Sequence, residues 1–310
     1  MRAWEIPPVR AHALTSQIAL MLPILLVIAA VTLYAVIDGL AKVMVQDMDV
    51  LQIIWSRFAF ALPLLPFIVG RRWPELFETG RWRLQIARGL IPIAGGISIV
   101  LALSVMPLAD ATALMFVSPL MLTALAVPLL KERVGLHRWS AVIIGFLGVL
   151  VIVRPGGTTM QWAALLPLLT AFLYALYQIA TRVLSRSTPP LVTFTYMVFV
   201  GTAGSTLALP FVWRTPDAIG WAMMAASGLL HGLAHYLVTR AFALAPAAIL
   251  APFNYAQLIG ATAFGYLIFG DLPDRWTIVG ALVIVGAGLY VAYRERRLAR
   301  LSGTPVHQSS

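Results

Sequence analysis

Hydrophobic residues along this chain occur in long continuous runs separated by short polar or basic links. A helix that crosses a bilayer needs about 20 apolar residues, whereas a spanning barrel strand is about half as long and alternates in polarity. The runs here are continuous and of helical length. The pattern therefore predicts an all-α integral membrane protein of about ten transmembrane helices, near residues 18–43, 50–69, 84–104, 109–130, 138–153, 161–182, 191–213, 219–242, 247–269 and 276–293.

Lysine and arginine are distributed unevenly between the two sides that these spans define. With the N-terminus placed inside, most basic residues fall on the cytoplasmic side, and the other side holds only Lys42, Arg154, Arg214 and Arg275. Loops rich in Lys and Arg stay in the cytoplasm. We therefore expect a multi-pass protein of the inner (cytoplasmic) membrane with both termini in the cytoplasm.

The composition excludes several other classes of protein. Of 310 residues, 60% are hydrophobic and 11% are charged, which leaves too little polar surface for a soluble globule. The net charge of +10 comes from links between apolar runs, so no binding to nucleic acid is expected. The chain has no cysteine and no GxxxxGK[ST] loop, and its first apolar run is interpreted as a retained span, not a cleaved signal peptide.

The chain also repeats itself. Tyr34, Asp38 and Lys42 follow one another at four-residue spacing in LYAVIDGLAK. LYALYQIATR repeats this spacing 140 residues later, with Tyr174 and Gln178 at its first two positions. Two units of five helices are therefore predicted. Because five is odd, the second unit enters the membrane in the opposite orientation, which gives an inverted pair.

One hairpin carries a resemblance to a known family. Residues 109–155 contain Pro119, a Leu-Lys-Glu exit that includes Glu132, and a Gly-rich run led by Trp139. This order resembles the second half of an EamA repeat of the drug/metabolite transporter (DMT) superfamily. The resemblance implies an N-terminal cytoplasmic arm at 1–17, repeats at 18–154 and 161–293, and a basic cytoplasmic tail at 294–310. In the second repeat no proline stands at the position of Pro119, near Gln257 and Leu258, which leaves the register of the ninth helix open.

The resemblance also implies a function. EamA-type proteins are secondary, ATP-independent transporters, so we expect export of amino acids or related small metabolites by alternating access. Uptake of a larger aromatic metabolite such as riboflavin is the alternative, and a membrane-embedded enzyme acting on lipid or quinone is a third. A small metabolite and the lipid bilayer are the expected partners, without cofactor or metal; proton coupling stays open, and the protein is expected to be a monomer or a weak homodimer.

Three ionisable residues stand out inside the first two spans. Asp38 and Lys42 lie one turn apart in the first span, and Arg57 lies in the second. An ionisable group in a span costs about 2.5–3.5 kcal/mol on insertion scales, so such groups are candidates for function. Asp38 is expected to pair with Arg57 or with Lys42, either as a structural clamp or as an outer gate. Asp38 could instead bind a substrate ammonium or a proton, and Lys42 could extend to the outer surface.

His231 and His235 lie four residues apart on one face of the eighth span. Two imidazoles lack the further ligands that a zinc site needs, so metal binding is disfavoured. A polar cavity face, where one histidine binds substrate or takes up a proton, competes with two buried histidines that have ordinary hydrogen-bond partners.

The remaining candidates are polar side chains near the midplane. The ninth span opens with Asn254, Tyr255 and Gln257, which either line a cavity or hold helices together. Tyr34, Tyr174 and Gln178 are included because repeat-related positions of an inverted pair converge near the midplane. By contrast, Arg88 and Arg240 are interpreted as cytoplasmic anchors, and Asp110 and Glu132 as helix-end groups.

Overall fold

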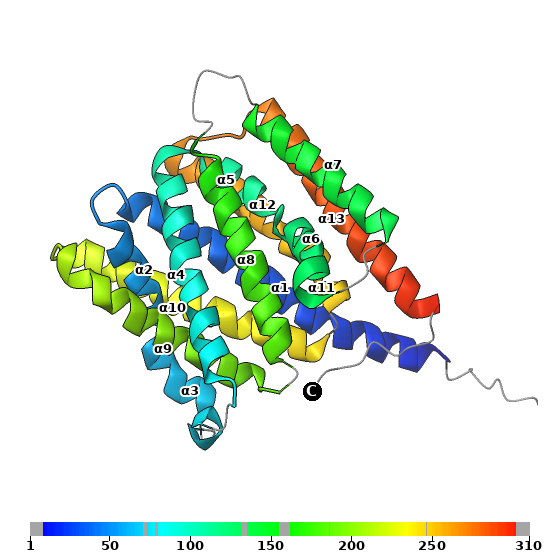
Figure 1. Ribbon diagram of the computed structural model, residues 1–310, viewed down its shortest axis with the longest axis horizontal. Helices are drawn as coiled ribbons and strands as arrows, with labels where there is room; N and C mark the ends of the chain where they lie inside the picture. Colours follow the sequence, from blue (N-terminus) through cyan, green and yellow to red (C-terminus); the bar gives the residue numbers. More distant parts are fainter. Residues whose placement is uncertain are drawn as a thin grey trace, which may run out of the picture.

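The computed structural model describes residues 9–70, 73–77, 80–131, 135–154, 162–185, 187–245 and 247–301, and within them all regular secondary structure is helical (Figure 1). Glu132, residues 1–8 of the predicted N-terminal arm and residues 302–310 of the predicted tail lie outside these ranges. The helices are α1 (Val9–Met44), α2 (Val50–Ala59), η1 (Leu62–Leu64), α3 (Leu65–Val69), η2 (Trp73–Phe77), α4 (Trp82–Val105), α5 (Leu108–Met115), α6 (Ser118–Leu130), α7 (Leu136–Val153), α8 (Leu165–Leu184), α9 (Pro190–Ala208), η3 (Leu209–Phe211), α10 (Ala218–Leu244), α11 (Ala247–Asn254), α12 (Ala256–Phe269) and α13 (Arg275–Leu301).

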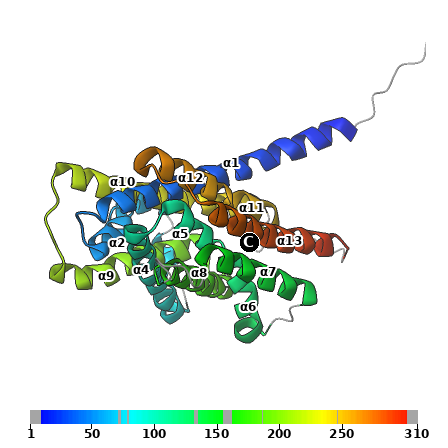
Figure 2. The same cartoon turned by 90° about the horizontal axis from the view of Figure 1, so that it is seen from above.

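The described helices account for the predicted membrane crossings. Eight spans are long and apolar enough to cross a membrane, counting α2 to α3 (with η1), α5 with α6, and α9 with η3 as single crossings. The histidine-containing α10 and the broken pair α11–α12 are outside that set, but both pack along α1 inside the same bundle. Together they make ten crossings. The N-terminal turns of α1 extend beyond the bundle (Figure 2), because this helix starts at Val9 and not at the predicted residue 18.

Three of the crossings are broken. Pro63 and Pro66 interrupt the second one. The fourth breaks after α5, and Pro119, predicted to lie inside a continuous helix, stands in the first turn of α6, where a missing N–H breaks no helical bond. The ninth breaks at Tyr255 without a proline at that point, and the Tyr255 ring contacts that of Phe116, 4.9 Å away between centroids. The two repeats are therefore broken at facing positions.

The two five-helix units pack against each other in matching ways (Figure 1). In the first unit α1 packs along α10 and α12; its counterpart α8 packs along α4 and α6. Three further pairs, α7 with α13, α2 with α9 and α5 with α12, each join a crossing of one unit to the corresponding crossing of the other. This exchange of partners is what a two-fold relationship between the units requires.

The pair formed by α7 and α13 shows that the units are inverted. Arg154, directly after α7, forms an ion pair with Asp274, directly before α13. At the other end, the Tyr290 hydroxyl lies 3.1 Å from Nδ1 of His137, in the first turn of α7. The two helices are therefore antiparallel. A two-fold axis that makes counterpart helices antiparallel runs across the helices, in the plane of the membrane.

Glycines allow the closest approaches between the units. A Cβ atom on Gly148 would lie 2.9 Å from the carbonyl oxygen of Gly280, so α7 and α13 meet nearly backbone to backbone. A Cβ on Gly228 of α10 would lie 2.3 Å from the carbonyl oxygen of Ser56 on α2. Small residues at helix crossings serve this purpose in membrane bundles.

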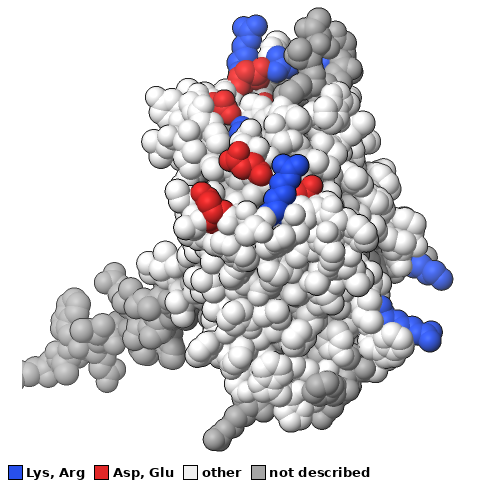
Figure 3. Space-filling view, turned by 90° about the vertical axis from the view of Figure 1, so that its left-hand side faces the viewer, with Lys and Arg blue, Asp and Glu red and all other residues white. Residues whose placement is uncertain are grey.

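One end of the bundle collects the described aspartates. This aspartate end is formed by the links at 45–49, 106–107, 212–217 and 270–274. Figure 3 shows acidic side chains, with basic ones among them, in the upper part of one face, above a broad area without charge. The aspartates are Asp47, Asp49, Asp217, Asp271 and Asp274 in the links, with Asp38 and Asp110 slightly deeper, in α1 and α5.

Candidate functional site

Asp38 and Arg57 form an ion pair within the first repeat. Asp49 starts α2 by accepting the Leu51 backbone N–H at 2.8 Å, and Arg57 lies in the last turn of this helix. Arg57 Nη2 donates to Asp38 Oδ1 on α1 at 3.1 Å, and only 9% of the arginine side chain and 14% of the aspartate side chain are exposed. Removing either charge would leave the other buried without compensation.

Lys42 does not join this pair. Its Nζ donates to Asp271 Oδ2 at 2.8 Å and to the Met106 carbonyl oxygen at 3.2 Å, and it lies 4.7 Å from the centre of the Phe269 ring. The predicted options of a Lys42–Asp38 pair and of a lysine extended to the surface are both wrong. The carboxylate that pairs with Lys42, on Asp271, belongs to the other repeat. This ion pair therefore connects the end of α1 to the link between α12 and α13.

The two histidines of α10 face α1. Their ring centroids are 4.7 Å apart, and the Tyr34 ring lies 6.2 Å from His231 and 5.5 Å from His235. Both ring nitrogens of His231 are buried without a hydrogen-bond partner among the described residues. Buried polar groups are almost always satisfied, so this imidazole is open to a substrate group, a water molecule or a proton. No three His, Asp or Glu side chains within the described ranges are grouped so that they could hold a metal ion.

Arg88 is buried inside the bundle, and its interpretation as a cytoplasmic anchor is wrong. It lies nearly two turns inside α4 and is only 4% exposed. Its Nε donates to Thr181 Oγ1 at 2.6 Å, Nη1 to the Thr193 carbonyl oxygen at 3.0 Å, and Nη2 to the Tyr177 hydroxyl. The guanidinium also lies 4.1 Å from the centre of the Tyr177 ring. The side chain points towards α8 and α9, which hold it inside the bundle.

Two tyrosines of α8 lie beside this arginine. The rings of Tyr174 and Tyr177 stack with centroids 5.9 Å apart and planes 13° from parallel. Tyr177 bonds to Arg88, whereas Tyr174 is 50% exposed. The Tyr177 ring is therefore buried against the guanidinium of Arg88, and the Tyr174 ring is accessible.

Electrostatic interactions connect these groups across the two repeats. Tyr34 interacts with Asp38 and with both tyrosines of α8. The charge of Arg57 interacts with His231. The charge of Arg88 interacts with His235, one helical turn further along α10. We call this set the central cluster; its members are Tyr34, Asp38, Arg57, Arg88, Tyr174, Tyr177, His231 and His235.

Other predicted site residues are not connected to the central cluster by any described contact. Gln178, Asn254 and Gln257 make no side-chain hydrogen bond among the described residues, and Tyr255 packs on Phe116 at the helix breaks. A role for these four residues in substrate binding stays a prediction.

The sequence interpretation missed four residues that the structure joins to the predicted ones: Arg88, Tyr177, Thr181 and Asp271. A signal existed for two of them. Arg88 is an arginine inside a predicted span, and Tyr177 lies three residues after Tyr174, on the same helix face. The contact between Lys42 and Asp271 joins residues 229 positions apart, which no local pattern indicates.

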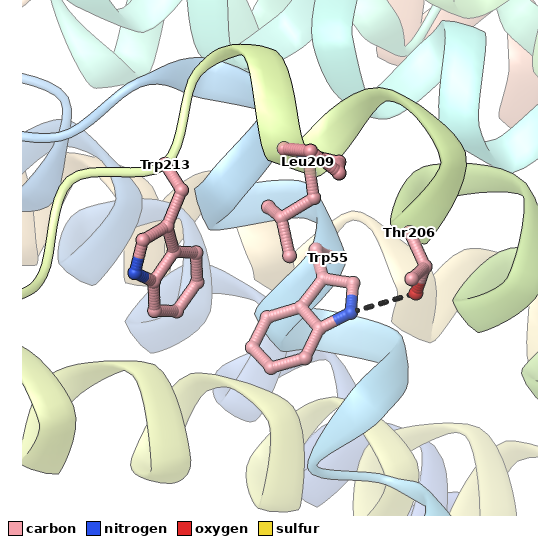
Figure 4. A pocket seen from close by; sticks show the side chains of 5 residues that line it. Trp55, Thr206, Leu209 and Trp213 are labelled. Carbon is pink, nitrogen blue, oxygen red and sulfur yellow. Dashed lines mark hydrogen bonds between the residues drawn. The ribbon is translucent and has the colours of Figure 1, made fainter.

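A separate pocket of about 450 Å³ lies on the flank where α2 meets the end of α9 (Figure 4). Trp55, Leu209, Pro210 and Trp213 line it, and Trp55 Nε1 donates to Thr206 Oγ1 at 3.0 Å. It is mainly apolar, and Thr206 is its single hydroxyl-bearing lining residue. Tryptophans of this kind are common near membrane interfaces. The charged groups needed to select a polar metabolite are in the central cluster instead.

A bundle of two inverted five-helix units that share buried ionisable groups near their interface defines a multi-pass membrane protein with the architecture of a secondary carrier. Comparison with known families agrees. The model of the EamA-like transporter family matches residues 21–154 and again residues 161–293. The chain belongs to this family, within the DMT superfamily, as the sequence resemblance predicted.

Similar proteins are named as transporters, not enzymes. An S-adenosylmethionine uptake transporter of Rickettsia bellii is 28% identical over 263 residues, covering 84% of this chain and 89% of its own. A riboflavin transporter of Rhizobium johnstonii is 33% identical over 244 residues (78% and 80%), and a pseudopaline exporter of Pseudomonas aeruginosa is 28% identical over 271 residues (85% and 93%). A solved crystal structure shares the fold, with TM-score 0.63 at 18% identity, over 89% of this chain and 98% of that one.

Proposed function

We propose that this protein is a secondary transporter that exports amino acids or related small metabolites by alternating access, without ATP. The observation that carries the proposal is the central cluster, in which buried Asp38, Arg57 and Arg88 of the first repeat are grouped with the histidines and tyrosines of the second. A zwitterionic metabolite has charges of both signs and can be matched by such a cluster. S-adenosylmethionine, which the Rickettsia bellii relative is named for, has an amino-acid end of this kind.

The contacts between the repeats suggest how access alternates. At the aspartate end, Lys42 of the first repeat is bonded to Asp271 of the second, and Arg154 to Asp274. These ion pairs hold the two repeats together at that end. Rocking of one repeat against the other would break and remake them while the central cluster is exposed to alternate sides.

The direction of transport depends on gradients as well as on structure, because a carrier without ATP moves its substrate in whichever direction the coupled gradients favour. Similar proteins are named for uptake and for export. Coupling to protons is part of our proposal, since neither ring nitrogen of His231 has a hydrogen-bond partner in the part of the chain that the structure describes.

We also propose that the aspartate end faces away from the cytoplasm, in the inner membrane of the cell. The basic links lie at the opposite end, and both termini are then cytoplasmic.

A second candidate substrate is a flat aromatic metabolite such as riboflavin. The stacked rings of Tyr174 and Tyr177, with Tyr174 half exposed, offer a planar surface for such a molecule. Similarity to the riboflavin transporter of Rhizobium johnstonii supports the same candidate.

Efflux and uptake in proteoliposomes test the proposal. Vesicles containing the protein would be loaded with labelled amino acids, S-adenosylmethionine and riboflavin, and the Asp38→Asn variant would be compared with Asp47→Asn, which changes an exposed aspartate of the same end. We expect movement of one class of solute that Asp38→Asn reduces and Asp47→Asn does not. Absence of movement for all three classes, with folded protein confirmed in the vesicles, would overturn the proposal.

A further inference from the structure

Arg88 is a buried cation without a carboxylate. It is 4% exposed, and no Asp or Glu among the described residues lies within ion-pair distance of it. Arg57, the other arginine of the central cluster, has Asp38 as its partner. A buried charge is costly unless it is paired, and neutral groups compensate it only in part.

The hydrogen bonds of Arg88 leave room for a ligand. A guanidinium has five N–H donors: one on Nε and two on each terminal nitrogen. Nε donates to Thr181, and each terminal nitrogen makes a single bond, to the Thr193 carbonyl oxygen and to the Tyr177 hydroxyl. All three acceptors are uncharged. Two N–H groups, one on each terminal nitrogen, have no acceptor among the described residues.

The arrangement around the guanidinium also holds it in place. Thr181 and Tyr177 lie one turn apart on α8, and Thr193 lies on α9, so Arg88 of α4 is fixed by two neighbouring helices. The planar contact with the Tyr177 ring restricts it further. An arginine held in this way is pre-organised for planar, two-point recognition of an oxoanion.

The site communicates with the rest of the central cluster. Tyr177 stacks on Tyr174, which is half exposed, and Arg88 acts electrostatically on His235. A ligand group that reaches Tyr174 therefore comes close to the guanidinium. Asp38 and Arg57 lie on α1 and α2, in the same repeat as Arg88, whereas Tyr174 and Tyr177 belong to the other repeat.

We propose that Arg88 binds a carboxylate of the transported metabolite, with Tyr177 and Thr181 as positioning residues. The inference rests on the proposed function and deepens it, because it names the chemical group of the metabolite that Arg88 selects. A metabolite with a carboxylate next to a flat or aliphatic part fits the guanidinium and the exposed face of Tyr174 together. Riboflavin has no carboxylate and would not use this site.

Binding to purified protein in lipid nanodiscs tests the proposal without requiring transport. Two matched pairs of probes serve: L-phenylalanine with 2-phenylethylamine, and S-adenosylmethionine with its decarboxylated form. Charge-assisted hydrogen bonds contribute about 1.5–3 kcal/mol, so the carboxylate member of a pair should bind roughly 10- to 100-fold more tightly. Arg88→Gln should abolish this preference. Arg88→Lys keeps the charge but loses the planar pair of N–H donors, so it should keep part of the carboxylate preference. Arg83→Gln on the same helix should leave the preference unchanged.

The comparison within each pair uses the unmodified protein, so it stands even if Arg88→Gln does not fold. Equal affinity for both members of both pairs would overturn the proposal, as would a preference that persists in Arg88→Gln. The two proposals fail in different ways. A carboxylate preference in binding without any transport contradicts only the proposed function, and transport without that preference contradicts only the role of Arg88.

Discussion

Arg57 on α2 donates to Asp38 on α1 at 3.1 Å, and each is the other's only charged partner among the described residues. The pair lies within one repeat, inside the membrane-spanning part of the bundle. Breaking a buried pair on one side costs about 3–5 kcal/mol, because the remaining charge is left uncompensated. The pair can therefore stabilise the resting state and still be displaced when a charged substrate offers equivalent partners.

Variants of this pair separate a structural clamp from a substrate site. Asp38→Asn and Arg57→Gln should each lower the amount of folded protein, and the double variant should recover it, because no lone charge is left. Transport per folded molecule should stay low in the double variant if Asp38 binds substrate or a proton. Fluorescence-detected size exclusion with normalised transport measures both quantities. Full transport by Asp38→Asn at equal protein level would rule out this role.

Replacing both His231 and His235 by Gln should change the dependence of transport on pH. His231 has no hydrogen-bond partner for either ring nitrogen among the described residues, and histidine is the side chain that changes charge between about pH 5 and 8. We expect the slope of the transport rate over that range to flatten. The measurement is counterflow of the identified substrate at a series of pH values. An unchanged profile in the double variant would exclude both residues as proton carriers.

Gly228→Ala should destabilise the fold, since its Cβ would lie 2.3 Å from the Ser56 carbonyl oxygen. Overpacking at such a contact costs about 1–3 kcal/mol. Gly286→Ala is the matched control, because a Cβ at that helical position meets nothing within 4 Å and alanine favours helix by about 0.5–1 kcal/mol. Thermal unfolding in detergent should give a lower midpoint for the first variant and an equal or higher one for the second. Equal midpoints for both would contradict the close approach of α10 and α2.

Asp274 should contribute to stability in a pH-dependent way. Partial burial disfavours its charge, but hydrogen bonds from the Thr277 backbone N–H and from Arg154 hold its pKa below the ordinary value. Its stabilisation is therefore present above about pH 3.9 and is lost as the pH falls through the lower pKa of the folded state. Asp274 also caps α13, accepting the Thr277 N–H at 2.8 Å.

Two substitutions at Asp274 distinguish the cap from the charge. Asp274→Asn keeps a capping side chain and loses the ion pair, whereas Asp274→Ala loses both, the cap alone being about 0.5–2 kcal/mol. The melting temperature at pH 7 should therefore fall more for alanine than for asparagine. The difference between the native protein and Asp274→Asn should shrink below about pH 3.9. A constant difference from pH 7 to pH 3 would contradict the charge contribution.

Cysteine labelling determines the orientation in the membrane. The chain has no cysteine, so single substitutions need no prior removal. Thr215→Cys, exposed at the aspartate end, should react with an impermeant maleimide added to intact cells. Gly135→Cys, exposed at the opposite end beside Lys131, should react only after the membrane is opened. The reverse pattern would overturn the proposed orientation.

Hydropathy and internal spacing determined the architecture of this protein before any tertiary contact was considered. Apolar runs of spanning length must form helices in a bilayer, and two similar units with an odd number of helices must be inverted. Asp38, Tyr34, His231 and His235 were recognisable because polar groups in such runs are costly. The four-residue spacing placed each pair of neighbours on one helix face.

Tertiary structure alone decided which of these groups meet. Asp38 and Lys42 lie on the same face of α1, so spacing allowed Asp38 to pair with Lys42 or with Arg57 of α2. Only the depth and rotation of the packed helices placed Arg57 beside Asp38 and Asp271 beside Lys42. Arg88 looked like an anchor because its distance from the start of a run does not reveal which neighbours surround it. Contacts between residues far apart in the chain depend on how whole helices are placed, and hydrophobic periodicity carries no information about that placement.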